Sequence, residues 1–145
     1  MVNVNKCKLL VLTCIDFRLP DHITAFLNQQ GYNRDYDLNT LPGASLGPCC
    51  ESYPHWRQTF ANIIEIAQKL HDIQKIMIID HHDCGAYHTF VNQPENDDHE
   101  KELHTTVSKK TLDWLKEAYP ELDVEIFYYQ NDGSFIKLHN HEAKS

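Results

Sequence analysis

The sequence lacks any long apolar run. Of its 145 residues 41% are hydrophobic, yet no uninterrupted apolar stretch approaches the roughly 20 residues that a membrane-spanning helix needs. We therefore expect no association with a membrane. The first twelve residues, MVNVNKCKLLVL, do not have the layout of a secretory signal peptide. This leads us to expect a cytoplasmic protein.

Positive charge is also scarce. The chain has 13 Lys and Arg against 21 Asp and Glu, which gives a net charge of -8. Nucleic-acid binding needs a basic face, so this balance argues against nucleic acid as the main partner. The five Cys are an odd number, and without a secretion signal they favour free thiols or metal ligands over a disulfide framework.

Strand patterns alternate with helix patterns along the chain. Two continuous apolar runs of strand length, Lys8–Cys14 and Lys75–Asp80, are typical of central parallel strands that are covered on both faces. Tyr36–Leu41 is a weaker strand, and residues 123–138 predict a hairpin around the turn Asn131-Asp132-Gly133. With no repeat or linker in sight, we predict one domain over residues 1–145. It has an α/β fold, a three-layer αβα arrangement with a mainly parallel central sheet and a C-terminal β-hairpin.

Three helices are predicted between these strands. The first follows Arg18, with Asp21 as its N-cap and Gly31 as its stop. The second runs from about Tyr53 to Leu70, and the third from about residue 103 to residue 118. The apolar stripe of the second helix predicts its buried face, which comprises Trp56, Phe60, Ile63, Ile64, Ala67 and Leu70.

Three potential metal ligands follow the two clearest strands. Cys14 ends the first apolar run, and His81 and Cys84 follow the later one. Because the carboxyl ends of parallel strands meet at one edge of a sheet, these side chains should lie together. Two thiolates and one imidazole form a three-ligand zinc site with an open fourth position, the pattern of catalytic zinc.

A carboxylate and a guanidinium stand beside the first of these ligands. In the stretch CIDFR, alternate residues of an extended chain point the same way, so Asp16 and Arg18 should face the same site as Cys14. A carboxylate near a metal can accept a proton from bound water or can ligate the metal itself. Bidentate pairing with Arg18 would hold Asp16 in place and keep it ionised.

The pair of motifs CIDFR and HHDCGA resembles the beta class of carbonic anhydrases, whose members carry Cys-x-Asp-x-Arg after the first strand and His-x-x-Cys-Gly after the third. The resemblance implies zinc held by Cys14, His81 and Cys84, and reversible hydration of carbon dioxide to bicarbonate through a zinc-bound hydroxide. It also implies that Asp16 orients or deprotonates the zinc-bound water while Arg18 holds Asp16 off the metal. A homodimer or a higher homo-oligomer, with the site near the subunit interface, is implied as well.

The stretch TLPGA, residues 40–44, departs from this family, in which most members have Arg-Asn-Ala-Gly after the second strand. Because in that family the stretch lies beside the site, two narrower interpretations stay open. One is hydrolysis of carbonyl sulfide or carbon disulfide by the same attack, and the other is zinc binding without catalysis. A third, from another class, is a redox protein that uses Cys49 and Cys50, which follow this stretch.

The remaining histidines receive lesser roles. His82 is expected to be structural, and His88, together with Tyr87, is a candidate for the site mouth or for proton transfer. His99 and His104 fall in a polar stretch, so we predict that both are solvated.

Overall fold

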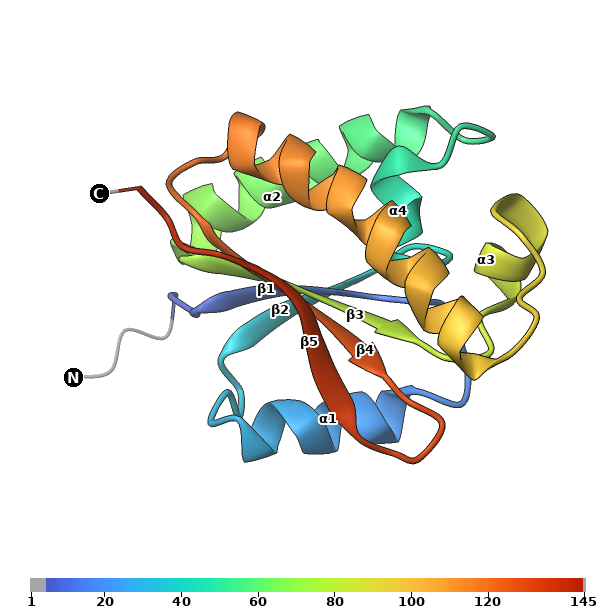
Figure 1. Ribbon diagram of the computed structural model, residues 1–145. Coiled ribbons are helices and arrows are strands. Elements are labelled where there is room, and N and C mark those ends of the chain that lie inside the picture. The colour runs from blue at the N-terminus through green and yellow to red at the C-terminus, as the bar shows by residue number, and fades with distance from the viewer. Residues whose placement is uncertain (1–4, 145) are drawn as a thin grey trace.

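The computed structural model describes residues 5–144 (Figure 1). The elements follow in the order β1 (Leu9–Thr13), α1 (Pro20–Gln29), β2 (Tyr36–Thr40), the 3₁₀ helix η1 (Ala44–Cys49), α2 (His55–His71), β3 (Lys75–His81), α3 (Gly85–Phe90), α4 (Asp97–Ala118), β4 (Asp123–Tyr129) and β5 (Phe135–His141). Within the described residues, no helix combines the length and the apolar character that crossing a membrane requires.

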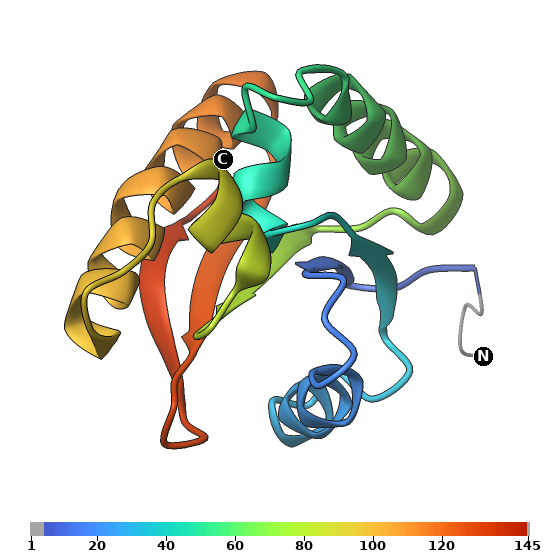
Figure 2. The same cartoon turned by 90° about the vertical axis from the view of Figure 1, so that its right-hand side faces the viewer.

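The five strands form one sheet in the order β2-β1-β3-β4-β5. The first four strands run parallel, and only β5 pairs antiparallel, with β4. Helix α1 covers one face of the sheet, and α2 and α4 cover the other (Figures 1 and 2). The predicted α/β fold with three αβα layers, a mainly parallel sheet and a C-terminal hairpin is therefore confirmed.

The core lies on both faces of the central strands. Every residue of β1 is buried, as are all residues of β3 after Lys75, which explains why these segments read as unbroken apolar runs. Below the sheet, α1 buries Ile23, Phe26 and Leu27. Burial of such a side chain stabilises a fold by roughly 1.5–3 kcal/mol. This core therefore holds β1 and β3, and the residues that follow them, in place.

Two helix predictions were wrong in detail. Asp21 is not the N-cap of α1, because Leu19 occupies that position and Pro20 begins the helix, where its fixed φ and missing N–H suit the first turn. Leu70 is 58% exposed. Leu70 lines a hollow beside the edge strand β2, and Leu38 and Ile66 line the same hollow.

Other elements differ in extent. Helix α4 begins at Asp97 rather than near residue 103, because the Asn96 side chain caps it by accepting a hydrogen bond from the amide of His99 at 2.8 Å. The short helices η1 and α3 were not predicted from the sequence. Both border the carboxyl edge of the sheet, where the predicted site residues lie.

Candidate metal centre

Cys14, His81 and Cys84 come together at the carboxyl edge of the sheet. Cys14 follows β1 directly, His81 is the last residue of the neighbouring strand β3, and Cys84 precedes α3. The two sulfur atoms are 4.0 Å apart, and the potential ligand atoms of all three residues lie within 4.8 Å of one another. All three residues are buried, so the cluster is shielded from competing water.

The imidazole of His81 is oriented for ligation. Its Nδ1 lies 2.7 Å from the carbonyl oxygen of His82, and because a carbonyl only accepts, Nδ1 carries the proton. The other nitrogen, Nε2, is buried and has no hydrogen-bond partner. A lone pair left without a partner beside two thiols is the donor set that zinc selects.

The sulfur of Cys14 lies in a polar environment that favours the thiolate. The backbone amide of Gly43 donates a hydrogen bond to Cys14 Sγ at 3.2 Å. A hydrogen bond from Cys84, with further contributions from His81 and Gly43, lowers the pKa of the Cys14 thiol well below its ordinary value. Since the thiolate is the form that binds a metal, this sulfur is prepared for ligation at neutral pH.

The stretch TLPGA supplies the donor to Cys14. Gly43 has φ +78°, a conformation that glycine adopts without strain. A Cβ at this position would lie 2.8 Å from Cβ of Leu46, which is too close. Gly43 therefore permits the tight turn that brings its amide to the sulfur.

Asp16 and Arg18 form the predicted pair. Arg18 Nε donates to Asp16 Oδ1 at 2.9 Å and Nη2 donates to Oδ2 at 2.5 Å, a bidentate arrangement. These hydrogen bonds lower the pKa of the Asp16 carboxyl to about 2, so it is ionised at neutral pH. Asp16 Oδ2 lies 3.8 Å from His81 Nε2, which places the carboxylate beside the cluster.

Comparison with known proteins identifies the family. Residues 4–139 match the family model described as "Putative carbonic anhydrase". The chain belongs to this family.

Two curated relatives are similar over most of their length. An uncharacterized protein of Rickettsia bellii (strain RML369-C) is 39% identical over 138 residues, which are 94% of this chain and 84% of the relative. An uncharacterized protein of Rickettsia conorii (strain Malish 7) is 37% identical over 132 residues, which are 90% of this chain and 71% of the relative. Both relatives are described as uncharacterized. They support the family but assign no activity, so an activity must be argued from the site of this chain.

In this family member, Arg18 has a second anchor. Its Nη1 donates to Asp83 Oδ2 at 2.9 Å, and Nη2 donates to the Asp83 carbonyl at 3.0 Å. Asp83 lies between His81 and Cys84 in the sequence, so Arg18 joins the loop after β1 to the loop after β3. This role of Asp83 was not predicted from the sequence, although its place inside the second motif was an available signal.

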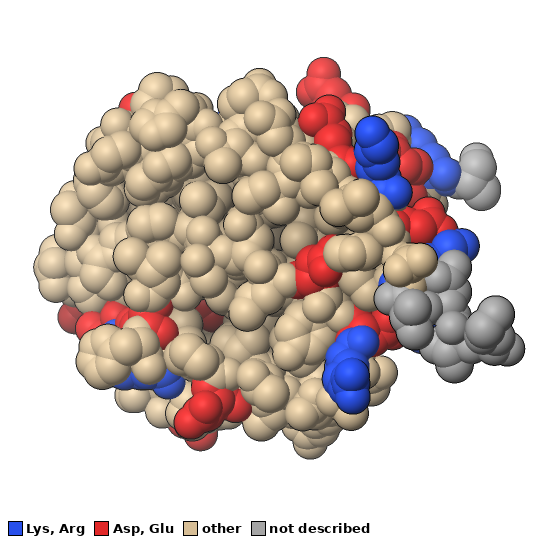
Figure 3. All heavy atoms as spheres, turned by 180° about the vertical axis from the view of Figure 1, so that it is seen from behind, with Lys and Arg blue, Asp and Glu red and all other residues tan. Residues whose placement is uncertain are grey.

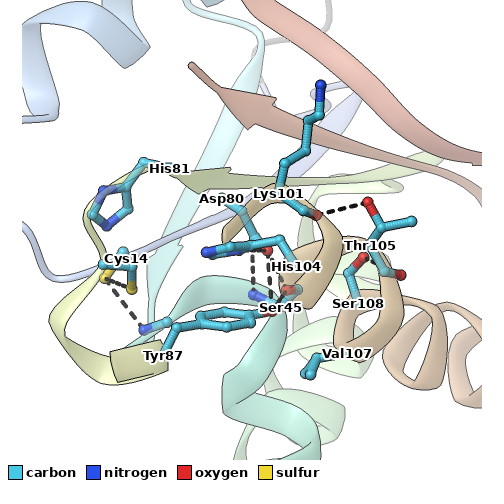
Figure 4. A network of polar contacts seen from close by, with 12 residues as sticks. Cys14, Ser45, Asp80, His81, Tyr87, Lys101, His104, Thr105, Val107 and Ser108 are labelled. Carbon is cyan, nitrogen blue, oxygen red and sulfur yellow. Dashed lines mark hydrogen bonds and ion pairs between the residues drawn. The ribbon is translucent and has the colours of Figure 1, made fainter. Parts of the chain in front are cut away.

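A buried polar network lies beside the cluster (Figure 4). Asp80 is fully buried and accepts hydrogen bonds from the amide and hydroxyl of Ser45 at 3.0 and 2.5 Å. It also accepts from the hydroxyl of Tyr87 at 3.2 Å and pairs with Nδ1 of His104 at 2.7 Å. The carboxylate thereby joins β3 to η1, α3 and α4.

The prediction that His104 is solvated was wrong. His104 is 0% exposed and stacks on Tyr87, with ring centroids 3.5 Å apart. It lies on the inner face of α4, because that helix packs its N-terminal half against the site. His99 is only partly buried. No local sequence signal distinguished the two histidines.

Glu100 holds the second ligand loop from the same helix. Its carboxylate is almost completely buried and accepts from the amide of Cys84 at 3.3 Å and from Nε2 of His88 at 2.8 Å. Burial alone would raise the pKa of Glu100, but hydrogen bonds from Asp83, His88 and Cys84 lower it. His88 thus has a structural partner, and His82 packs near the ring of Tyr129.

Cys49 and Cys50 lie outside the metal cluster. Cys49 Sγ points to the carbonyl oxygens of Ser45 and Val107 at 3.7 and 3.9 Å, and burial raises the pKa of its thiol. Cys50 is buried. These surroundings keep Cys49 protonated at neutral pH.

An apolar hollow of about 310 Å³ opens beside Cys14 and Asp16. Ile15, Phe17 and Leu38, which line it, are 64%, 91% and 58% exposed. Figure 3, which looks at the molecule from behind, shows a broad area with few charged side chains. A small apolar molecule could reach the edge of the cluster through such a hollow.

Proposed function

We propose that this family member is a beta-class, zinc-dependent carbonic anhydrase, a carbonate dehydratase that interconverts carbon dioxide and bicarbonate. The observation that carries the proposal is the convergence of the two sulfur atoms of Cys14 and Cys84 on the unpartnered Nε2 of His81. The family match supports the reaction class.

Cys14, His81 and Cys84 would hold the ion and leave its fourth position open. Zinc held there would supply a Lewis acid that makes water nucleophilic near neutral pH. Glu100 and the carbonyl of His82 hold the ligand loop and the imidazole in place, the kind of support that ligating residues need.

Asp16 would orient the attacking water and accept its proton. The carboxylate is ionised and held by the two-pronged hydrogen bond from Arg18, so one fixed acceptor faces the site. Arg18 is anchored in turn on Asp83. This anchoring keeps Asp16 from swinging onto the metal, where it would block the fourth position.

A second copy of the chain would cover the exposed apolar side chains around the hollow. Phe17 is 91% exposed only one residue from Asp16, and contact with another subunit would remove it from water. We propose a homodimer or a larger homo-oligomer on this ground. Phe17→Ser should shift the mass measured by light scattering toward the monomer, and an unchanged mass would place the interface elsewhere.

Stopped-flow carbon dioxide hydration tests the enzyme assignment. The protein should carry about one zinc at the Cys14–His81–Cys84 cluster and be scanned from neutral to alkaline pH. We expect turnover that falls about 10²–10⁴-fold in Asp16→Asn, the range for loss of a general base, with zinc content unchanged. Asp113→Asn, at an exposed carboxylate on α4, is the matched control and should retain full activity.

The remaining outcomes separate the alternatives. Activity confined to alkaline pH would indicate that Asp16 leaves Arg18 and blocks the site at neutral pH. Inactivity at every pH, with zinc bound, would contradict the proposal. Carbonyl sulfide and carbon disulfide would then be tried next, and inactivity on those as well would indicate a zinc-binding protein without catalysis.

A further inference from the structure

A second group of metal-competent side chains lies at the opposite end of the sheet. Cys7 precedes β1, Asp37 lies in β2 and His71 is the last residue of α2. A potential ligand atom from each of the three lies within 4.8 Å of the others. Ligand bonds to zinc measure about 2.0–2.3 Å, so three atoms this close together can share one ion after small side-chain rotations.

The backbone fixes this arrangement. The amide of Cys7 donates to the carbonyl of His71 at 3.0 Å, which ties the segment before β1 to the end of α2. Asp37 pairs with Leu10 in the parallel ladder between β2 and β1. Three segments that are distant in sequence are thus held together by main-chain contacts.

The side chains are polar, partly exposed and only partly satisfied. His71 Nδ1 lies 2.7 Å from Asp37 Oδ2, and the two side chains are 39% and 30% exposed. The sulfur of Cys7 makes a long contact of 3.5 Å with the carbonyl of Leu9. An ion from solution could therefore reach all three without opening the core.

The local field favours a cation. The carboxyl end of α2 carries the negative end of the helix dipole, and His71 is its last residue. Asp35 and Asp72 are each paired with a lysine, Lys8 and Lys6 respectively, so the negative field at the site comes from Asp37 and from the end of the helix.

We propose that Cys7, Asp37 and His71 form a second metal site, which takes a divalent transition-metal ion such as zinc. Thiolate, imidazole and carboxylate are all zinc ligands, and three protein ligands leave one position for water. Occupancy would fasten the segment before β1 to the edge strand and to α2, and would stabilise the folded chain by mass action. The inference does not depend on the carbon dioxide activity.

The thiol of Cys7 should give no thiolate-to-metal absorption when no ion is bound. Burial and the negative charge of Asp37 raise the pKa of Cys7 to about 11, so the thiol is protonated at neutral pH. A thiolate-to-metal absorption band from Cys7 appears only when an ion displaces that proton.

Cadmium exchange supplies the test, with Cd²⁺ as the probe. The full chain is loaded with Cd²⁺, freed of weakly held ions by gel filtration, and measured for cadmium per chain and for thiolate-to-cadmium absorption. We expect two ions per wild-type chain and one per chain of Cys7→Ser, with roughly one third of the absorption lost, because one of three ligating thiolates is gone. Cys49→Ser removes another half-buried thiol and should keep both ions.

Equal cadmium content and equal absorption in the wild type and in Cys7→Ser would overturn the proposal. Asp37→Asn guards against an effect of Cys7→Ser on folding, because it keeps the thiol and nearly the same shape. This variant must also lose the second ion, and retention of both ions would likewise overturn the three-ligand site. Since the result is the difference in cadmium content between the wild type and each variant, an inactive enzyme leaves it readable.

Discussion

Asp80 and Asp16 both lie next to His81, in very different surroundings. Asp80 is fully enclosed, and its partners are a backbone amide, two hydroxyls and the imidazole of His104. The Asp16 side chain is 11% exposed, and its main partner is the guanidinium of Arg18, which is itself 47% exposed. A carboxylate whose oxygens are all occupied by buried donors can only stabilise the fold. A carboxylate that is held from one side keeps lone pairs that can take part in a reaction.

Replacing Asp80 should therefore have the largest effect on stability. In Asp80→Ala, the imidazole of His104 and the polar groups of Ser45 lose their partner in the interior. Breaking a buried pair by removing one member costs about 3–5 kcal/mol. Urea unfolding of the wild type and of the variant measures this loss in the free energy of unfolding.

A control and a double variant sharpen this test. Asp113→Ala, at an exposed pair with Lys109, should leave the unfolding midpoint unchanged within error. The double variant Asp80→Asn, His104→Gln should be less destabilised than the sum of its single changes, because contacting groups couple. Simple additivity would mean that the Asp80–His104 pair does not act as a unit.

Glu100 is an intermediate case, since it is buried like Asp80 but supports a ligand loop. Glu100→Ala removes the acceptor for the amide of Cys84, and loss of such support typically lowers metal affinity about 10–100-fold. Competition with a zinc chelator of known affinity measures the change. Glu100→Gln keeps one acceptor and should fall between the wild type and Glu100→Ala.

Glu102→Ala serves as the matched control, because Glu102 is an exposed glutamate on the same turn of α4. Its zinc affinity should equal that of the wild type. An equal loss in Glu100→Ala and Glu102→Ala would show that the charge of the helix, and not the hydrogen bond to the loop, sets the affinity.

The contrast between the two aspartates also explains what the sequence could reveal. Cys14, Asp16 and Arg18 are close in sequence and follow a strand, so the position of the strand end predicted their meeting with His81 and Cys84. The partners of Asp80 come from three separate elements, and nothing local in a polar helix start distinguishes a buried histidine from a solvated one. Periodicity predicted the layers well, but it could not predict η1 or α3, because these short helices depend on tertiary contacts.

The Asp16–Arg18 pair should have the smallest effect on stability, and its effect should depend on pH. The pKa of Asp16 is lowered to about 2 from its ordinary value of 3.8, so the folded chain favours the ionised form. The stabilisation is therefore fully present above about pH 4, the ordinary pKa of an aspartate in the unfolded chain. It is lost as the pH falls toward 2. Because about half of the Arg18 side chain is exposed to solvent, screening limits the contribution to about 1 kcal/mol or less.

Unfolding free energies of the wild type and of Asp16→Asn, measured from pH 7 to pH 2, test this dependence. Their difference should be constant down to about pH 4 and should then shrink, since protons bind the unfolded carboxyl first. A difference that instead grew on acidification would mean that Asp16 is protonated in the folded chain, and that Arg18 does not hold it as a carboxylate. A loss as large as that of Asp80→Ala would remove the distinction between the two aspartates, because Asp16 would then support the fold as well as the chemistry.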